Sequence, residues 1–113
     1  CKMCYVRYDY DEVLKMGGLL SIEQWLSIAK EFKEMGSLFL LLTGGEVFTY
    51  PHFKELYIKL YEMGFIITIN TNATLINEEV VEWLKQYPPK CMSISLYGSS
   101  NAVYEELCSG IKW

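Results

Sequence analysis

The chain has 113 residues, of which 51% are hydrophobic, so it can form one small domain with an apolar core. Ten basic and fourteen acidic side chains give a net charge of −4, which argues against a nucleic-acid partner, because backbone binding needs a surplus of Lys and Arg. No apolar run approaches the roughly 20 residues of a membrane span. The chain begins on Cys1 without a signal-like segment, so we expect a cytoplasmic piece of a longer protein that binds no membrane.

The N-terminus reads Cys1-Lys2-Met3-Cys4-Tyr5. A C-x2-C pair can bind zinc, hold an iron–sulfur cluster or form a redox disulfide. A zinc ribbon would need a second close pair, but Cys91 and Cys108 lie 17 residues apart, and we interpret them as ordinary thiols that pack as small hydrophobes. The acidic residues 9–12 are expected in a solvated loop.

Four helices follow along the chain. Ser21 and Gln24 form a capping-box pattern at the start of the first helix, and Gly36 supplies its end. Its apolar residues recur at three- and four-residue steps, at Ile22, Trp25, Leu26, Ala29 and Phe32. Pro51 opens the second helix and Gly64 closes it. Asn77 caps the third, which ends before Pro88, and residues 100–108 form the fourth.

Three apolar runs between these helices predict strands, and they begin at Ser37, Phe65 and Cys91. The tripeptide Glu-Met-Gly precedes the first two runs, at 34–36 and 62–64, and the third run starts 26 residues after Phe65. A strand-plus-helix unit of this length, repeated, predicts parallel strands with crossover helices. The expected fold class is therefore α/β, a partial (β/α) barrel of about three parallel strands with flanking helices.

Small polar residues follow each predicted strand, at 43–46, 70–72 and 97–99. We call these three stretches the carboxyl rim, because the carboxyl ends of parallel strands meet at one edge, where such folds bind ligands. A purely structural rim could have this composition, since turns favour Gly and Asn. Turn composition does not explain the acid in Gly44-Gly45-Glu46.

Together these features resemble the radical S-adenosylmethionine (SAM) superfamily, whose members carry C-x3-C-x2-C followed by an aromatic residue, and Gly-Gly-Glu after the second strand. Cys1, Cys4 and Tyr5 match the second Cys, the third Cys and the aromatic residue. The runs 68–76 and 93–100 resemble the third and fourth strands with their loops. Residues 96–110 look closest to the subgroup that matures peptides and sulfatases (SPASM-type).

The chain departs from the family pattern in three respects. The first cysteine and the strand before it are missing, and so is the second half of the barrel. Val47 stands where the family usually has Pro. The resemblance therefore implies that residues 1–113 are a fragment, the N-terminal part of a radical SAM domain.

In the parent enzyme, the resemblance implies a [4Fe–4S] cluster and SAM, cleaved reductively to a 5′-deoxyadenosyl radical that abstracts hydrogen from a substrate. A peptide or protein is the substrate class that the subgroup suggests, with a reductant such as flavodoxin or ferredoxin as partner. Cys1 and Cys4 are the expected metal ligands. The expected cofactor-binding residues are Tyr5, Gly44, Gly45, Glu46, Asn70 and Ser95.

The resemblance gives these residues different roles. Gly44 and Gly45 let the backbone approach the methionine ammonium of SAM without a Cβ in the way. For Glu46 two roles stay open, bracing that segment or touching the ligand. Tyr5 offers its backbone near the adenine. Ser95 shares a face of the third strand with Ser93, because side chains alternate along a strand, and the resemblance places it near the ribose or carboxylate.

Two other classes of function stay open from the residues alone. The chain can be a non-catalytic βα scaffold, or a zinc or dithiol module that uses Cys1 and Cys4. In each case, a slice of parallel sheet with an uncovered apolar face is expected to self-associate.

Overall fold

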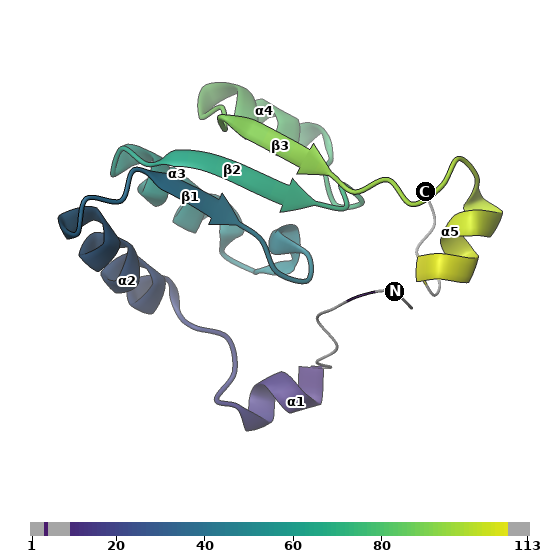
Figure 1. The fold of residues 1–113 in the computed structure, drawn as a ribbon, viewed down its shortest axis with the longest axis horizontal. Coiled ribbons are helices and arrows are strands. Elements are labelled where there is room, and N and C mark those ends of the chain that lie inside the picture. Colours follow the sequence, from purple (N-terminus) through teal and green to yellow (C-terminus); the bar gives the residue numbers. More distant parts are fainter. Residues whose placement is uncertain (1–3, 5–9, 109–113) are drawn as a thin grey trace.

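The computed structural model describes Cys4 and residues 10–108 (Figure 1). From α2 onward, helices and strands alternate in the predicted order. The elements are α1 (Tyr10–Lys15), α2 (Ile22–Glu34), β1 (Phe39–Leu42), the 3-10 helix η1 (Val47–Thr49), α3 (Phe53–Glu62), β2 (Ile66–Thr71), α4 (Glu78–Gln86), β3 (Cys91–Ile94) and α5 (Asn101–Cys108).

Helix boundaries follow the short-range signals in the sequence. The Ser21 hydroxyl accepts from the Gln24 N–H at 3.3 Å and the Gln24 side chain accepts from the Ser21 N–H at 2.8 Å, so the capping box forms. The Asn77 side chain accepts from the Val80 N–H at the start of α4. Gly36 and Gly64 adopt φ values of 90° and 81° after α2 and α3, which confirms them as helix ends.

Two helical segments correct the sequence analysis. Asp11 and Glu12, expected in a solvated loop, are exposed but lie in the first turn of α1, where the helix dipole favours them; Asp9 lies outside the described residues. After β1, residues 47–49 form η1. Pro51, expected to open the next helix, lies in a turn, and α3 begins two residues later, at Phe53. Both segments are too short to show a helical period of apolar residues.

The three strands pair in parallel in the order β1-β2-β3, as predicted (Figure 1). Leu42 pairs with Ile69, and Thr71 pairs with Ile94. β3 ends at Ile94, so Ser95 lies one residue beyond the strand on which it was expected. Its N–H still donates to the Thr71 carbonyl at 2.9 Å, which extends the ladder by one bond.

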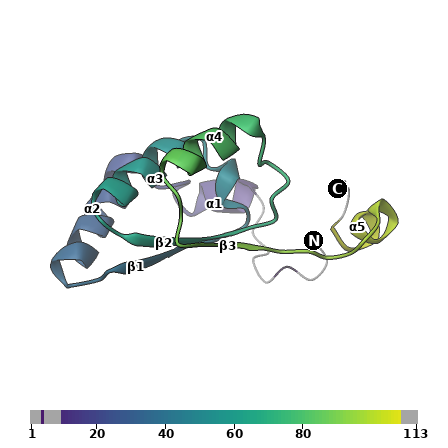
Figure 2. The ribbon, with the colours of Figure 1, turned by 90° about the horizontal axis from the view of Figure 1, so that it is seen from above.

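Helices α2, α3 and α4 lie on one face of the sheet (Figure 2). The side chains of Ile67, Ile69 and Thr71 point to this covered face and are 2%, 0% and 4% exposed. Their neighbours on β2 point to the opposite face and are less buried, because side chains alternate along a strand. We call that opposite face the bare face.

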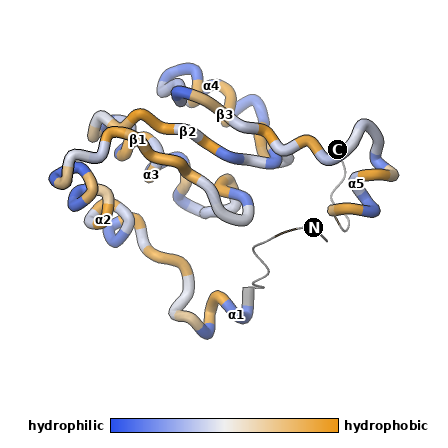
Figure 3. Tube along the Cα trace, viewed as in Figure 1, coloured by the Kyte–Doolittle hydropathy of each residue, from blue (hydrophilic) through white to orange (hydrophobic). Residues whose placement is uncertain are grey.

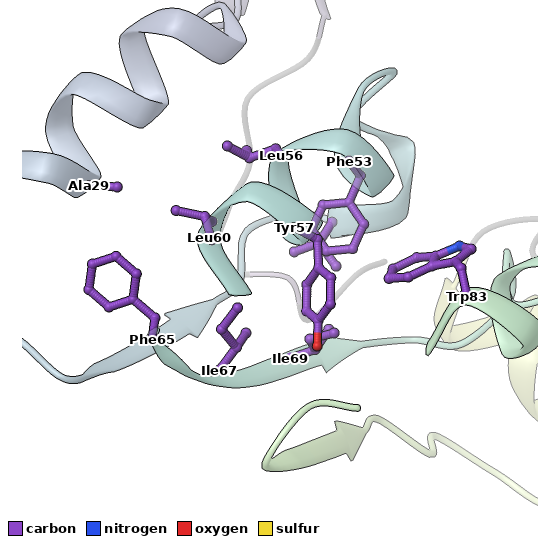
Figure 4. Packing of buried hydrophobic residues seen from close by; sticks show 10 residues of the cluster. Ala29, Phe53, Leu56, Tyr57, Leu60, Phe65, Ile67, Ile69 and Trp83 are labelled. Atoms are coloured by element: carbon purple, nitrogen blue, oxygen red, sulfur yellow. The ribbon is translucent and has the colours of Figure 1, made fainter. Parts of the chain in front are cut away.

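The core lies between the covered face and the helices. Phe53, Tyr57 and Trp83 meet there, with ring centroids of Tyr57 and Trp83 5.1 Å apart (Figure 4). Tyr57 is fully buried, and its hydroxyl donates to the carbonyl oxygen of Tyr87 at 2.8 Å. Burial raises the pKa of Tyr57 to about 12.

The bare face is apolar at its amino end, where Phe39 and Leu41 are 70% and 56% exposed and Ile66 is 39% exposed. Figure 3 shows the hydrophobic colouring of β1 and of the first part of β2. The radius of gyration is 15.5 Å, whereas a compact domain of this length has about 13 Å. This open arrangement agrees with a partial barrel. Among the described helices, none combines the length and apolar character needed to cross a membrane.

Candidate functional site

The parallel register brings the first two stretches of the carboxyl rim into direct contact. β1 leads into Gly44-Gly45-Glu46, and β2 ends at Thr71 beside it. The contact between them is made by the carboxylate of Glu46, which bonds to residues 25 and 26 positions later in the chain.

Glu46 uses both carboxylate oxygens inside the protein. Its Oε1 accepts from the Thr71 hydroxyl at 2.8 Å and from the Phe48 N–H at 3.2 Å. Its Oε2 accepts from the Asn72 N–H at 2.7 Å. The side chain therefore caps η1 and ties the β1–η1 loop to the end of β2, which gives it the geometry of a brace between loops.

The backbone of Glu46 is also held. Its carbonyl oxygen accepts from the Thr49 hydroxyl at 2.6 Å and from the Thr49 N–H at 3.1 Å. Side chain and main chain together fix the end of the Gly-Gly-Glu segment, while Leu42 fixes its beginning in the sheet.

Gly44 and Gly45 are exposed, and their φ angles lie outside the left-handed region that favours glycine. Apart from chain neighbours, no heavy atom of the described residues lies within 4 Å of a Cβ built on either glycine. Neither backbone conformation nor internal packing therefore calls for glycine here. The residues leave room for the backbone to meet a ligand from outside the chain.

Polar side chains lie on the bare face next to this segment. Asn70 pairs in register with Ser93, and the two share that face because Thr71 and Ile94 point the other way. Ser95 follows at the same parity, and both Asn70 and Ser95 are half-buried. The predicted polar positions are therefore brought together at one end of the bare face. The Asn72 side chain is engaged locally, since its carbonyl oxygen accepts from the N–H and hydroxyl of Thr74.

The predicted cluster ligands are only partly within the described structure. Cys4 is half-buried, whereas Cys1 and Tyr5 lie outside the described residues. Over Cys4 and residues 10–108, no three His, Cys, Asp or Glu side chains gather closely enough to hold a metal ion. Cys108 is buried as expected, but Cys91 is exposed at the start of β3, so it does not pack as a small hydrophobe.

Two further rim features had no role in the sequence analysis. Thr71 is a buried polar residue that bonds to Glu46. At the third stretch, the Tyr97 N–H donates to the Tyr104 hydroxyl at 3.0 Å, and a Cβ on Gly98 would lie 2.5 Å from Val103 Cγ1. The loop after β3 is thus packed tightly against α5. Gly98, a glycine in a short loop before a helix, was the sequence signal that could have indicated this close packing.

We compared the sequence with known protein families and proteins. The sequence profile of the Radical SAM superfamily matches residues 1–113. The chain is 30% identical over 106 residues to the antilisterial bacteriocin subtilosin biosynthesis protein AlbA of Bacillus subtilis (strain 168), which covers 93% of this chain and 23% of that protein. It is 27% identical over 88 residues to the AdoMet-dependent heme synthase of Methanosarcina barkeri (strain Fusaro / DSM 804), covering 78% of this chain and 25% of that protein.

No solved structure matches the chain significantly. The chain spans about a quarter of the length of these two curated relatives. The match over all 113 residues agrees with the parallel α/β slice and with the Gly-Gly-Glu segment at its carboxyl rim, and on this evidence the chain belongs to the radical SAM superfamily.

Proposed function

We propose that this chain is the first part of the catalytic domain of a longer radical SAM enzyme, and that its carboxyl rim binds the methionine end of SAM. The observation that carries the proposal is the open space at Gly44 and Gly45, where the described protein itself gives no reason for two glycines. An ammonium or carboxylate group can approach the main chain there without meeting a Cβ.

Each rim residue then has a defined task. Gly44 and Gly45 present main-chain groups to the methionine ammonium. Glu46 holds that segment in place, because its three hydrogen bonds tie the loop after β1 to the end of β2. Asn70 and Ser95 offer an amide and a hydroxyl from the bare face to the ribose or carboxylate of SAM.

Cys1 and Cys4 would hold the [4Fe–4S] cluster, with Tyr5 beside the adenine. A cluster held by these two thiolates and a third cysteine of the parent would pass an electron from the reductant to SAM. Cleavage would release methionine and a 5′-deoxyadenosyl radical, which would abstract hydrogen from a substrate. The protein would orient SAM at the carboxyl rim, and the sheet would form one wall of the site.

A peptide or protein is the proposed substrate class, and a flavodoxin- or ferredoxin-type protein is the proposed reductant. Support for the substrate class comes from a bacteriocin biosynthesis protein, to which this chain is 30% identical over 106 residues, or 93% of its length. The second relative is named for a different kind of product, heme, so we expect the parts of the parent outside this chain to set the choice of substrate.

Anaerobic reconstitution of the parent enzyme with iron and sulfide tests the cluster assignment. Cys91→Ala is the matched control, because Cys91 is an exposed cysteine at the opposite end of the sheet. We expect wild type and Cys91→Ala to absorb broadly in the visible and to bleach with dithionite. Cys4→Ala should lose this absorption and the bound iron.

Other outcomes would support the alternatives. A colourless protein with stoichiometric zinc that depends on Cys4 would indicate a zinc module, and a well-folded protein that binds neither metal would indicate a scaffold. Full iron content in Cys4→Ala would contradict the assignment of Cys4.

A further inference from the structure

We infer that Thr71 is a positioning residue for SAM binding: its hydroxyl aligns the Glu46 carboxylate, which in turn sets the Gly44-Gly45 segment. The inference rests on the proposed function of the carboxyl rim, and it assigns a role to a residue that contacts no ligand itself. Thr71 is the last residue of β2, and its side chain points to the covered face, where it is 4% exposed.

The Thr71 hydroxyl makes two hydrogen bonds in opposite senses. It donates to Glu46 Oε1 at 2.8 Å and accepts from the Ala73 N–H at 2.9 Å. A hydroxyl can do both, whereas the isosteric valine can do neither. The geometry therefore uses the hydroxyl, and the shape of the side chain alone would not suffice.

The second of these bonds holds an unusual backbone. Ala73 has φ of 60°, in the left-handed region that residues other than glycine rarely adopt. Such a conformation persists only where neighbouring contacts impose it, and ligand sites are common places for it. By accepting from the Ala73 N–H, Thr71 stabilises this turn, and the turn places the Asn72 N–H 2.7 Å from Glu46 Oε2.

Thr71 thus controls two of the three hydrogen bonds to the Glu46 carboxylate, one directly and one through the turn at Ala73. The third, from the Phe48 N–H, is local to the same loop and is the longest at 3.2 Å. Gly44 and Gly45 have no side chains to fix them, so their position depends on β1 before them and Glu46 after them. Loosening Glu46 should therefore loosen the segment proposed to meet SAM.

The experiment uses the reconstituted parent enzyme and measures the Kd for SAM by isothermal titration. We expect Thr71→Val to raise the Kd about tenfold, the effect of losing roughly one hydrogen bond to a charged group. Thr71→Ser keeps the hydroxyl and should remain within about threefold of wild type. Thr74→Val is the matched control, because it removes an exposed threonine hydroxyl in the same loop that does not bond to Glu46.

Iron content and visible absorption serve as readouts of the fold and of the cluster, and both should be unchanged in Thr71→Val. A double-mutant cycle with Glu46→Ala, which removes the acceptor of the Thr71 hydroxyl, separates positioning from general loosening. If Thr71 acts through Glu46, the double variant should bind SAM about as weakly as Glu46→Ala alone. Additive losses would overturn the inference.

Three results decide between the inference and the proposed function. Wild type that loads the cluster but does not bind SAM would overturn both. Wild type that binds SAM while Thr71→Val binds equally tightly would overturn only the role of Thr71. If Thr71→Val does not fold, Thr71→Cys replaces it, since a thiol is a weaker donor. Binding by Thr71→Cys equal to that of Thr71→Ser would overturn the inference.

Discussion

A valine at position 45 should damage SAM binding without damaging the fold. In the described part of the chain, no heavy atom other than chain neighbours lies within 4 Å of an added Cβ at Gly45, and its φ is outside the left-handed region. Replacing glycine at such a position also restricts the unfolded chain, which stabilises by about 0.4–1 kcal/mol for alanine. We therefore expect Gly45→Val to change the free energy of unfolding by less than about 1 kcal/mol.

The same side chain should obstruct the ligand. Forcing extra methyl groups into a close contact costs about 1–3 kcal/mol, and each 1.4 kcal/mol changes a dissociation constant about tenfold. The Kd for SAM should rise about tenfold or more. Isothermal titration gives the affinity, and urea denaturation of the same sample gives the stability.

Gly36→Val provides a control with the opposite pattern. Gly36 has φ of 90° at the end of α2, so a valine there should lower the free energy of unfolding by about 1–2 kcal/mol. Gly36 lies at the other end of the sheet from the carboxyl rim, so SAM affinity should stay unchanged in the folded variant. A well-folded Gly45→Val protein with wild-type affinity would remove the Gly-Gly-Glu segment from the site.

Three further predictions concern the slice of sheet itself. The pKa of Tyr57 is raised from 10.0 to about 12 in the folded chain, so the stability that its neutral hydroxyl contributes is fully present below pH 10 and is lost as the pH rises to about 12. In urea denaturation, Tyr57→Phe should therefore lower the free energy of unfolding by about 1 kcal/mol at neutral pH. Above about pH 10, the free energy of unfolding of this variant should fall less steeply than that of wild type. The chain alone should self-associate through the bare face, and Leu41→Glu should reduce the mass seen by light scattering across a dilution series; a monomer at every concentration would contradict this. Gly98→Ala should destabilise the chain by about 1–3 kcal/mol in denaturant titrations, because its Cβ would lie 2.5 Å from Val103 Cγ1 and 2.8 Å from Val103 Cβ; adding Val103→Ala removes the first of these contacts and should recover part of the loss, and wild-type stability of Gly98→Ala would contradict the prediction.

Local signals in the sequence predicted most of the fold. Ser21 and Asn77 cap their helices as expected, because a cap depends on hydrogen bonds within three residues. The parallel order followed from the spacing of strand and helix units. α1 and η1 were missed, since six and three residues give no helical period.

The site was predicted less completely, because its contacts cross the sheet. The sequence pointed to Gly44-Gly45-Glu46 but not to the partners of Glu46, since Thr71 lies 25 residues away and meets it only through the strand register. The sequence likewise could not predict that Gly44 and Gly45 have φ angles outside the left-handed region. Ser95 was misplaced by one residue, because the end of a strand depends on its partner.

The most direct measurement is reductive cleavage of SAM by the parent enzyme, reconstituted anaerobically and assayed for 5′-deoxyadenosine after addition of dithionite. The account predicts that wild type and Cys91→Ala form this product and that Cys4→Ala forms none. A cluster-loaded wild type that binds SAM and releases no 5′-deoxyadenosine would contradict the proposed activity, and so would equal product formation by Cys4→Ala.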